Sequence, residues 1–373
     1  MMQTIRSLLA ALALIGAGAG GASAAGFPWP SYADRPDSWY RSDEASRLAE
    51  NLFSHQTDRG DWPKNFDTSS EPNRGDRSRL RGTFDNGATV GEMRFLARAF
   101  VATGRERYRE AFIKALDHVL SAQYPCGGWP QSDPPGKGYP RYITFNDNTT
   151  INLLELVRDV ARSDRFAFVD QGRRDAAKHA FAGGIGCILK CQVRVDGALT
   201  AWCAQHDPMT FEPKGARSFE LPSISGGESA GILLLLMSLD DPSPEVVRAI
   251  RAGVRWYERS RLTGIRQVVV DGDKKIVRDP AAPPLWARFY EIETNRPFFC
   301  GRDGVKKYDL AEIEAERRNG YSWYGDWGRR VLDRFTRWER DHPELREDAG
   351  RRDSREPTGA VIIDGHRLNG GRA

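Results

Sequence analysis

The stretch GGWPQ at residues 127–131 follows a helical run at residues 107–122 and the glutamine Gln123. A second helical run, at residues 150–162, comes after it. The order is therefore helix, glutamine, tryptophan-bearing loop and helix again. This unit decides the fold, because it occurs more than once.

Two further copies of the unit flank the first. They comprise residues 45–52 with Gln56 and GDWPK at residues 60–64, and residues 175–190 with Gln192, Asp196, Gly197 and Trp202. The three glutamines lie 67 and 69 residues apart. Such a period indicates a degenerate internal repeat.

The helices that follow the tryptophan loops differ from those that precede them. They are expected at residues 88–103, 150–162 and 226–239, and the last is apolar on nearly every side, as in a buried inner helix. An amphipathic run at residues 245–260 continues the alternation. The chain is therefore predicted to be mainly α, an (α/α) toroid of paired inner and outer helices. Its loops should gather a site at one end.

Beyond the repeats the chain changes character. Residues 266–277 alternate around Asp271-Gly272-Asp273 and predict a β-hairpin. Residues 285–299 lack clean periodicity, whereas residues 310–318 and 327–341 return to helix. We therefore expect a small β-containing part beside the toroid.

The two ends of the chain are expected to lie outside the folded unit. Arg6 precedes an apolar run at residues 8–15, and Ala22-Ser23-Ala24 is a small-x-small cleavage pattern, so residues 1–25 are predicted to be a signal peptide. Residues 26–345 would form a single catalytic domain, and residues 346–373 a loose tail. The mature protein is expected to be secreted or periplasmic, without a membrane partner.

Composition sets weaker limits. The formal net charge of +4 argues neither for nor against a nucleic-acid partner. Arginine greatly outnumbers lysine and recurs in loops rich in tryptophan and tyrosine, where it suits the bidentate binding of carboxylates. We expect a monomer that binds no nucleic acid.

Five cysteines are few for an exported protein of this size. Cys187, Cys191, Cys203 and His206 are spaced loosely like a zinc site. The favoured interpretation is one disulfide, such as Cys191 to Cys203, with the remaining thiols buried.

Two short stretches place a carboxylate among amides and hydroxyls just before an inner helix. They are TFDNGAT at residues 83–89, with Asp85, and ITFNDN at residues 143–148, with Asp147. Each aspartate alone is explained as a helix N-cap. Placed one repeat apart at the same end of a toroid, however, the two carboxylates would converge and require a cation or an arginine between them. Oxygen ligands of this kind suit Ca²⁺.

Arginines and aromatic residues supply the other candidates. Arg217, Arg288 and Arg302 lie in loop-like segments with aromatic neighbours. Five aromatic residues are either stacking platforms for sugars or core plugs beneath loops, namely Trp62, Trp129, Trp286, Trp323 and Tyr290.

At these residues the chain resembles the family 10 polysaccharide lyases, which are pectate lyases with an (α/α) toroid. The stretches that carry the resemblance run in family order from about residue 45 to residue 328. They are GDWPK at 60–64, TFDNGAT at 83–89, GGWPQ at 127–131, ITFND at 143–147, RSFELPS at 217–223, ARFYEI at 287–292, TNRP at 294–297 and RDG at 302–304. One departure is Asn148-Thr149, at the edge of the predicted metal loop.

The resemblance implies Ca²⁺-assisted β-elimination on polygalacturonate. Asp85 and Asp147 would hold the calcium, and Arg217 would be the base that removes the C5 proton. Substrate-binding residues would be Arg288 and Arg302, together with Lys64, Trp129 and Tyr290. Two rivals remain open: a non-catalytic toroid that binds acidic glycans, and a hydrolase that uses paired carboxylates from Asp85, Asp147, Glu220 and Glu291.

Overall fold

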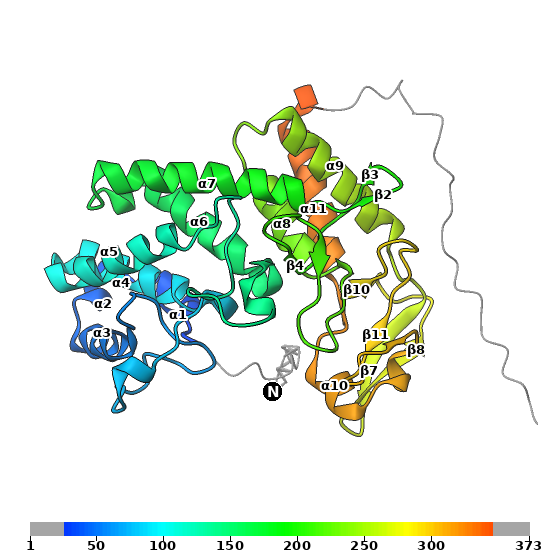
Figure 1. Ribbon diagram of the computed structural model, residues 1–373, viewed down its shortest axis with the longest axis horizontal. Helices are drawn as coiled ribbons and strands as arrows, with labels where there is room; N and C mark the ends of the chain where they lie inside the picture. The colour runs from blue at the N-terminus through cyan, green and yellow to red at the C-terminus, as the bar shows by residue number, and fades with distance from the viewer. Residues whose placement is uncertain (1–25, 346–373) are drawn as a thin grey trace, which may run out of the picture.

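The computed structural model describes residues 26–345, so the predicted signal peptide and the predicted tail lie outside the described residues. Helices dominate the described chain (Figure 1). Their bounds are α1 Pro30–Ala33, α2 Asp37–Tyr40, α3 Asp43–His55, α4 Val90–Thr103, α5 Glu106–Ser121, α6 Thr149–Arg162, α7 Gln171–Cys191, α8 Glu228–Leu236, α9 Pro244–Arg259, α10 Ala315–Gly320 and α11 Trp327–Asp341.

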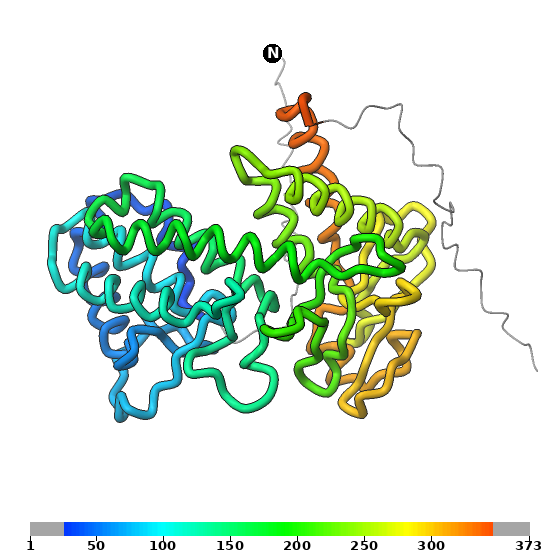
Figure 2. Tube along the Cα trace, turned by 45° about the horizontal axis from the view of Figure 1, so that its top comes forward, coloured from blue at the N-terminus to red at the C-terminus, as the bar shows by residue number. Residues whose placement is uncertain are grey.

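The helices pack in the order in which the chain visits them. Helix α4 packs against α5, α6 against α7, and α8 against α9, while α11 packs against both α8 and α9. In Figures 1 and 2 the path runs from α2–α5 at one end, across α6 and α7, to α8, α9 and α11 at the other. The helical ranges expected in the three repeats are confirmed, with ends shifted by a few residues.

The repeated glutamines tie each unit to the next. Gln56 Nε2 donates to the carbonyls of Gly60 in its own loop and of Ala111 in α5, at 2.9 Å in both cases. Gln123 and Gln192 make the matching pairs of bonds, which reach α7 and α9. One side chain thereby satisfies two backbone carbonyls at a helix boundary. Each unit of the predicted internal repeat thus contains the same pair of glutamine hydrogen bonds.

The tryptophans of the loops are core residues. Their indole N–H groups donate at 2.8 Å to a carbonyl in or near the end of the preceding helix, and their side chains are at most 1% exposed. These residues are Trp62, Trp129, Trp202 and Trp286. A buried indole needs a partner for its N–H, and the helix carbonyl provides one. Stacking platforms are therefore the wrong interpretation, and core plugs the right one.

The strands are short apart from one hairpin. The predicted β-hairpin is confirmed as β7 Ile265–Val270 and β8 Asp273–Arg278, with Val270 paired to Asp273 beside the turn. The other strands have two residues each: β1 Ile143–Thr144, β2 Arg194–Val195, β3 Ala198–Leu199, β4 Gln205–His206, β5 Pro213–Lys214, β6 Ile224–Ser225, β9 Trp286–Ala287, β10 Phe289–Tyr290, β11 Phe299–Cys300, β12 Lys306–Lys307 and β13 Tyr324–Gly325. Strands β1, β4 and β5 form a three-stranded sheet in that order.

One expected helix is shorter than predicted. Residues 310–318 form a 3₁₀ turn at Leu310–Glu312 and then α10. The side chain of Asp309 accepts from Ala311 N and closes a capping box with Glu312, which makes the 3₁₀ turn a separate element.

Two hydrophobic clusters support the helices and the strands respectively. The larger extends from Tyr40 to Trp338 and includes the loop tryptophans Trp62, Trp129, Trp202 and Trp286. The smaller is aromatic and lies under the short strands, around Phe219, Phe289 and Trp323. The second cluster fixes the segment that follows β5, on which Arg217 lies.

The expected Cys191–Cys203 disulfide is wrong. All five cysteines are free thiols; Cys191 Sγ lies 4.0 Å from Cys187 Sγ, and Cys203 Sγ faces the carbonyl of Lys214. The zinc alternative also finds no support, because the described residues contain no group of three metal-binding side chains. Both ring nitrogens of His206 are engaged, and burial lowers its pKa to about 4.

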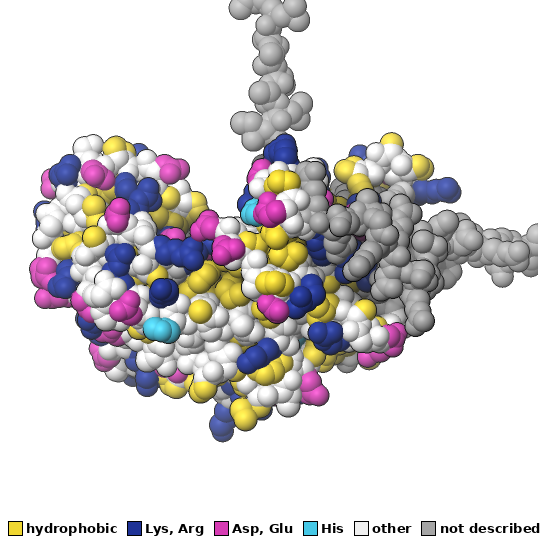
Figure 3. All heavy atoms as spheres, turned by 90° about the horizontal axis from the view of Figure 1, so that it is seen from above, with side chains coloured by type: hydrophobic (Ala, Val, Ile, Leu, Met, Phe, Trp, Pro, Cys, Tyr) yellow, Lys and Arg dark blue, Asp and Glu magenta, His cyan; other side chains and the backbone are white. Residues whose placement is uncertain are grey.

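Within residues 26–345, no helix has the length and apolar content needed to cross a membrane. On the face seen from above, basic and acidic side chains alternate without an extended patch of one sign (Figure 3). Positive and negative side chains are therefore interspersed over that face.

Candidate active site

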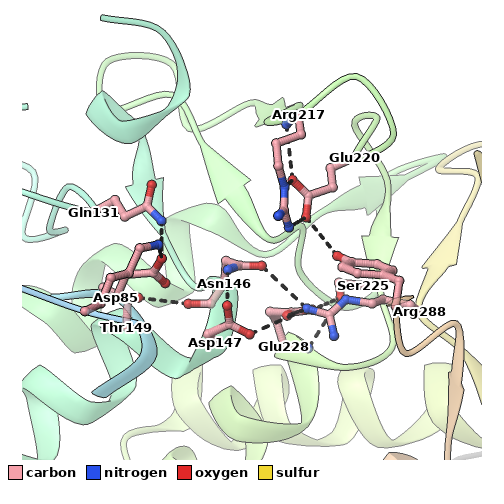
Figure 4. Close-up of polar contacts among 12 residues, drawn as sticks. Asp85, Gln131, Asn146, Asp147, Thr149, Arg217, Glu220, Ser225, Glu228 and Arg288 are labelled. Atoms are coloured by element: carbon pink, nitrogen blue, oxygen red, sulfur yellow. Dashed lines mark hydrogen bonds and ion pairs between the residues drawn. The ribbon is translucent and has the colours of Figure 1, made fainter. Parts of the chain in front are cut away.

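A polar cavity of about 480 Å³ lies where the tryptophan loops meet the turns that precede the inner helices. Figure 4 shows its polar contacts. The residues around the cavity are Lys64, Asn65, Asp85, Asn86, Gln131, Tyr139, Asn146, Asp147, Gln205, Arg217, Glu220, Arg288, Arg317, Gly320, Tyr321 and Ser322.

The repeat delivers side chains to this cavity at a fixed position. Two residues beyond the tryptophan, three loops place a functional side chain in the lining: Lys64, Gln131 and Arg288. In the Trp202 loop that position is Ala204, whose methyl group carries no such function. Because each loop is pinned by its tryptophan, these side chains enter from the same end of the helices.

Asp85 is the more buried of the two aspartates. Its residue is 2% exposed, and its Oδ2 accepts from Lys64 Nζ and Gln131 Nε2. Its other oxygen, Oδ1, is buried without a hydrogen-bond partner among the described residues. A buried carboxylate oxygen with no partner is costly unless something else binds it.

Asp147 faces the cavity with its side chain 41% exposed. Asn146 Nδ2 donates to its Oδ2 at 2.6 Å, and Arg288 lies 3.8 Å from its Oδ1. Burial in the cleft, followed by the charge of Glu228, raises the pKa of Asp147, whereas Arg288 lowers it. The negative charge of Glu228 beside Asp147 therefore favours the binding of a cation.

The N-cap interpretation is wrong for both aspartates. Helices α4 and α6 have Thr89 and Asn148 at their N-caps, with no side-chain cap bond in either case. Asp85 and Asp147 instead lie in the preceding 3₁₀ turns, Asp85–Gly87 and Asn146–Asn148, which contact each other as expected for adjacent repeats.

The two aspartates are offset by one position in the repeat. Thr83 N and Thr144 N bond the carbonyls of Trp62 and Trp129 at 3.0 Å, which makes the two threonines equivalent. Asp85 then corresponds to Asn146, and Asp147 to Asn86. Asn86 and Asp147 share the left-handed conformation, with φ of 55° and 50°. The offset explains why one carboxylate is buried and the other exposed.

Arg288 crosses the floor of the cavity. Its NH2 donates to Glu228 Oε1 at 2.6 Å, and its guanidinium lies 4.8 Å from the ring centre of Tyr321. Burial lowers the pKa of Arg288, but Glu228, Tyr321 and Asp147 outweigh it, so the pKa is above its usual value. Arg288 Nε is buried without a partner among the described residues, so one N–H remains for a ligand.

Arg217 is held side-on by Glu220. Its Nε donates to Oε2 at 2.7 Å and its NH2 to Oε1 at 2.5 Å, and Tyr321 OH donates to Oε1 at 2.8 Å. The hydrogen bonds that Arg217 donates to Glu220 raise the pKa of Arg217, although partial burial opposes this. Glu220 is buried, whereas the Arg217 side chain is 47% exposed. The ion pair fixes the orientation of the half-exposed Arg217 guanidinium at the cavity.

Comparisons with known proteins show which family the chain resembles. A family model for pectic acid lyase matches residues 56–332. The chain is similar to the solved structure of a family 10 polysaccharide lyase from Cellvibrio cellulosa, with 36% sequence identity and a TM-score of 0.73. The match covers 83% of this chain and 96% of the Cellvibrio cellulosa chain.

The chain belongs to the pectic acid lyase family. A mutant of the Cellvibrio cellulosa enzyme, solved in complex with trigalacturonic acid, matches with the same identity and TM-score over 83% of this chain and 97% of its own. A search of curated proteins finds no match. The resemblance stated from the sequence is confirmed, and the protein is a polysaccharide lyase.

Three residues predicted to bind substrate in this lyase do not line the cavity. Trp129 and Tyr290 are at most 1% exposed, and Tyr290 OH donates a hydrogen bond to the carbonyl of Ser260 at 2.8 Å. Both predictions are wrong in this structure, because neither ring has a free face. Arg302 lies outside the lining, with its side chain 62% exposed and paired with Glu316 at 3.0 Å.

Several residues of the lyase site were not predicted. Arg317 lines the cavity in place of Arg302, with its guanidinium 4.5 Å from the ring centre of Phe219. Gln131 and Glu228 were also missed. The repeat carried a signal for Gln131, since it lies two residues beyond Trp129, as Lys64 does beyond Trp62.

The donor set fits Ca²⁺, with part of the shell left to the substrate. Asp85 Oδ1 is an orphaned buried oxygen, and Asp147 presents its carboxylate to the cavity. The described residues contain no group of three or more His, Cys, Asp or Glu side chains that could hold a metal ion. Because Ca²⁺ takes 6–8 oxygen ligands, water and substrate carboxylates would complete the shell.

Proposed function

We propose that this lyase cleaves de-esterified polygalacturonate by Ca²⁺-dependent β-elimination and releases 4,5-unsaturated oligogalacturonides. The observation that carries the proposal is one cavity with Asp85 and Asp147 on one side and Arg217, Arg288 and Arg317 on the other. The trigalacturonic acid bound to the Cellvibrio cellulosa enzyme supports the substrate class.

Asp85 and Asp147 would hold the calcium, which when bound supplies Lewis-acid neutralisation of the substrate carboxylate. Lys64 and Gln131 keep Asp85 in place by their bonds to Oδ2 and leave Oδ1 open. The fixed charge of Arg288 favours a second uronate carboxylate on the cavity floor.

The elimination itself requires a base beside C5 of the sugar. A neutral Arg217 nitrogen would take the C5 proton, the C–H electrons would form the C4=C5 double bond, and the C4–O4 bond would break. The departing O4 then takes a proton from solvent. Fixed positive charge around the carboxylate stabilises the negative charge that develops before the bond breaks.

The pairing with Glu220 sets a condition on this role. Arginine is normally protonated, and Glu220 raises the pKa of Arg217 further. A bound calcium and a second guanidinium would repel the positive charge of Arg217 and so lower its pKa, against the effect of Glu220. Activity is therefore expected to rise with pH, toward an alkaline optimum.

One assay tests the reaction class. The protein is incubated with polygalacturonate and Ca²⁺ while the ultraviolet absorbance of the unsaturated product and the number of reducing ends are followed. β-Elimination raises both and stops when a chelator is added. Reducing ends without absorbance would indicate a hydrolase, and neither signal would indicate a glycan-binding protein. Glu220 is poorly placed as a hydrolytic acid, because Arg217 and Tyr321 hold it and its pKa, despite burial, is lowered.

The wider proposals concern assembly and location. We infer that the helices close an (α/α) toroid of inner and outer helices over a single domain at residues 26–345. We also infer that the protein acts as an exported monomer after removal of residues 1–25. Comparison of the mature N-terminus and of the mass in solution with these boundaries tests them.

A further inference from the structure

A second hollow, of about 670 Å³, adjoins the active-site cavity and differs from it in chemistry. Its walls are mainly apolar, with rings from Tyr124, Tyr142 and Phe211 and the side chain of Met209. Arg141 and Asp207 are the charged residues of the lining. A concave apolar surface with few polar groups is typical of a ligand site.

The two hollows share a wall. Tyr139 lines the active-site cavity and Arg141, two residues on, lines the second hollow; Gln205 and Asp207 are divided in the same way. Two residues of extended chain span at most about 7 Å. The two hollows therefore lie within a few ångströms of each other along these two segments, close enough for one polymer to contact both.

Arg141 is the basic residue in the lining of this hollow. It is exposed, its guanidinium has neither a hydrogen bond nor an ion pair within the described residues, and it lies 5.6 Å from the ring centre of Tyr142. Asp207 faces the same hollow, but its carboxylate accepts from Met209 N at 2.9 Å and Thr210 N at 3.1 Å and lies 3.9 Å from Lys214 Nζ. The charge of Arg141 helps to lower the pKa of Asp207, but the N–H groups of Arg141 have no acceptor among the described residues and remain available to a ligand.

The loop that carries Phe211 is held in an unfavourable conformation. Phe211 has φ of 62°, a left-handed value that is rare for a bulky residue. Its N–H bonds Asp207 O at 2.9 Å, and its carbonyl accepts from His206 Nδ1 at 2.8 Å. Met209, at the tip of the loop, is 84% exposed. Strain of this kind concentrates at functional sites, and here it turns an aromatic ring toward the hollow.

We propose that this hollow is an accessory subsite for the acidic polysaccharide chain, in which the aromatic side chains contact the apolar faces of the sugars and Arg141 binds a uronate carboxylate. The inference rests on the proposed function, because it extends the same substrate beyond the cavity. Charge complementarity and the shared wall favour a polyuronate over an uncharged or purely apolar partner.

Arg141→Ala, with Arg35→Ala as its control, tests the proposal. Arg35 is likewise exposed and lies 5.4 Å from the ring centre of Trp39, but it does not line either hollow. Initial rates are measured on galacturonate oligomers of increasing length and on polygalacturonate. In Arg141→Ala, kcat/KM for long chains should fall about two- to tenfold while that for trigalacturonate is unchanged.

Phe211→Gly provides a second variant that removes the ring and relieves the positive φ. It should show the same loss confined to long chains. Equal ratios of long-chain to short-chain kcat/KM in Arg141→Ala, Arg35→Ala and the unmodified protein would overturn the subsite. A loss in Phe211→Gly without one in Arg141→Ala would also overturn it, since the hollow would then hold an apolar ligand.

Binding separates failure of the subsite from failure of the proposed function. Retardation in gels that contain polygalacturonate is measured for the same variants without any turnover. If the unmodified protein forms no unsaturated product, the proposed function fails, yet weaker retardation of Arg141→Ala than of Arg35→Ala still supports the subsite. Equal retardation of the two variants would contradict it.

Discussion

The two sides of the cavity neutralise their charges differently. On the carboxylate side, Asp85 accepts from Lys64 and Gln131 through one oxygen and leaves the other without a partner among the described residues. On the arginine side, Arg217 is paired through two nitrogens with Glu220. The first side therefore keeps a carboxylate oxygen that a metal ion would bind, whereas the carboxylate of the second side is fully used by its partners.

The sides also differ in how the chain builds them. The carboxylates lie on turns at the same place in adjacent repeats, so their position follows from the repeat. The arginine side joins the segment after β5 to Tyr321, 101 residues beyond Glu220, and α8 to β9–β10 through Glu228 and Arg288. A repeated pattern thus supplies the candidate metal ligands, and long-range contacts assemble the candidate base.

The largest effect is expected from Arg217. Arg217→Ala and Arg217→Lys should each lower kcat by about 10²- to 10⁴-fold, since lysine lacks the planar fork that Glu220 grips. The absorbance assay measures the loss, and calcium binding should survive. Arg302→Ala serves as control and should stay within about twofold, because its ion pair is exposed. Substantial activity in Arg217→Lys would move the base elsewhere.

The carboxylate side predicts a change in calcium requirement. Asp85→Asn and Asp147→Ala should each raise the calcium concentration for half-maximal activity about 10- to 100-fold. Asp117→Ala is the matched control, since Asp117 has a 49% exposed side chain and pairs with Arg173 on the outer helices. An unchanged calcium titration in Asp147→Ala would remove that residue from the metal site.

Glu220→Gln sharpens the arginine side. Loss of the carboxylate removes the interaction that raises the pKa of Arg217, so the alkaline rise in kcat/KM should move to lower pH. At high pH the rate should fall roughly tenfold, because the side-on orientation weakens. Glu50→Gln, which removes an ion pair between Glu50 and NH1 of Arg107, should leave the pH profile unchanged. A profile that does not shift would show that Glu220 acts only structurally.

The smallest effect on activity is expected at the loop tryptophans. Trp129→Phe removes the bond to Val119 O and should lower the free energy of unfolding by about 1–3 kcal/mol, with KM unchanged. Urea unfolding and steady-state kinetics measure the two quantities. Trp62→Phe should behave alike, because Trp62 bonds Leu52 O in the helix of its own unit. A raised KM with unchanged stability would restore the stacking role.

Much of the fold could be predicted from the sequence because its signals are local and repeated. Gln56, Gln123 and Gln192 marked the three units correctly, and the turn chemistry of Asp271-Gly272-Asp273 marked the hairpin. The segments of Asp85 and Asp147 were also found in advance, since hydroxyl, amide and carboxylate groups cluster there before a helix.

The site was predicted less completely because side-chain direction is not a local property. Arg302 and Arg317 both lie over the ring of Phe219, at 5.9 and 4.5 Å from its centre, yet only Arg317 of these two lines the cavity. Trp129 looks the same in sequence whether it is exposed or buried. Its burial depends on the carbonyl of Val119 and on packing against α7 residues, which no short pattern encodes.

By itself, then, the sequence determined the repeat, the order of helices and hairpin, and the two aspartate turns, because each rests on residues within a few positions of one another. Only the tertiary structure decided which oxygen of Asp85 lacks a partner, that Glu220 holds Arg217, and that the tryptophans are buried. Those features depend on side-chain direction and packing, as where Gln131 reaches Asp85 from another loop and Tyr321 reaches Glu220 from 101 residues away, and no short sequence pattern encodes them.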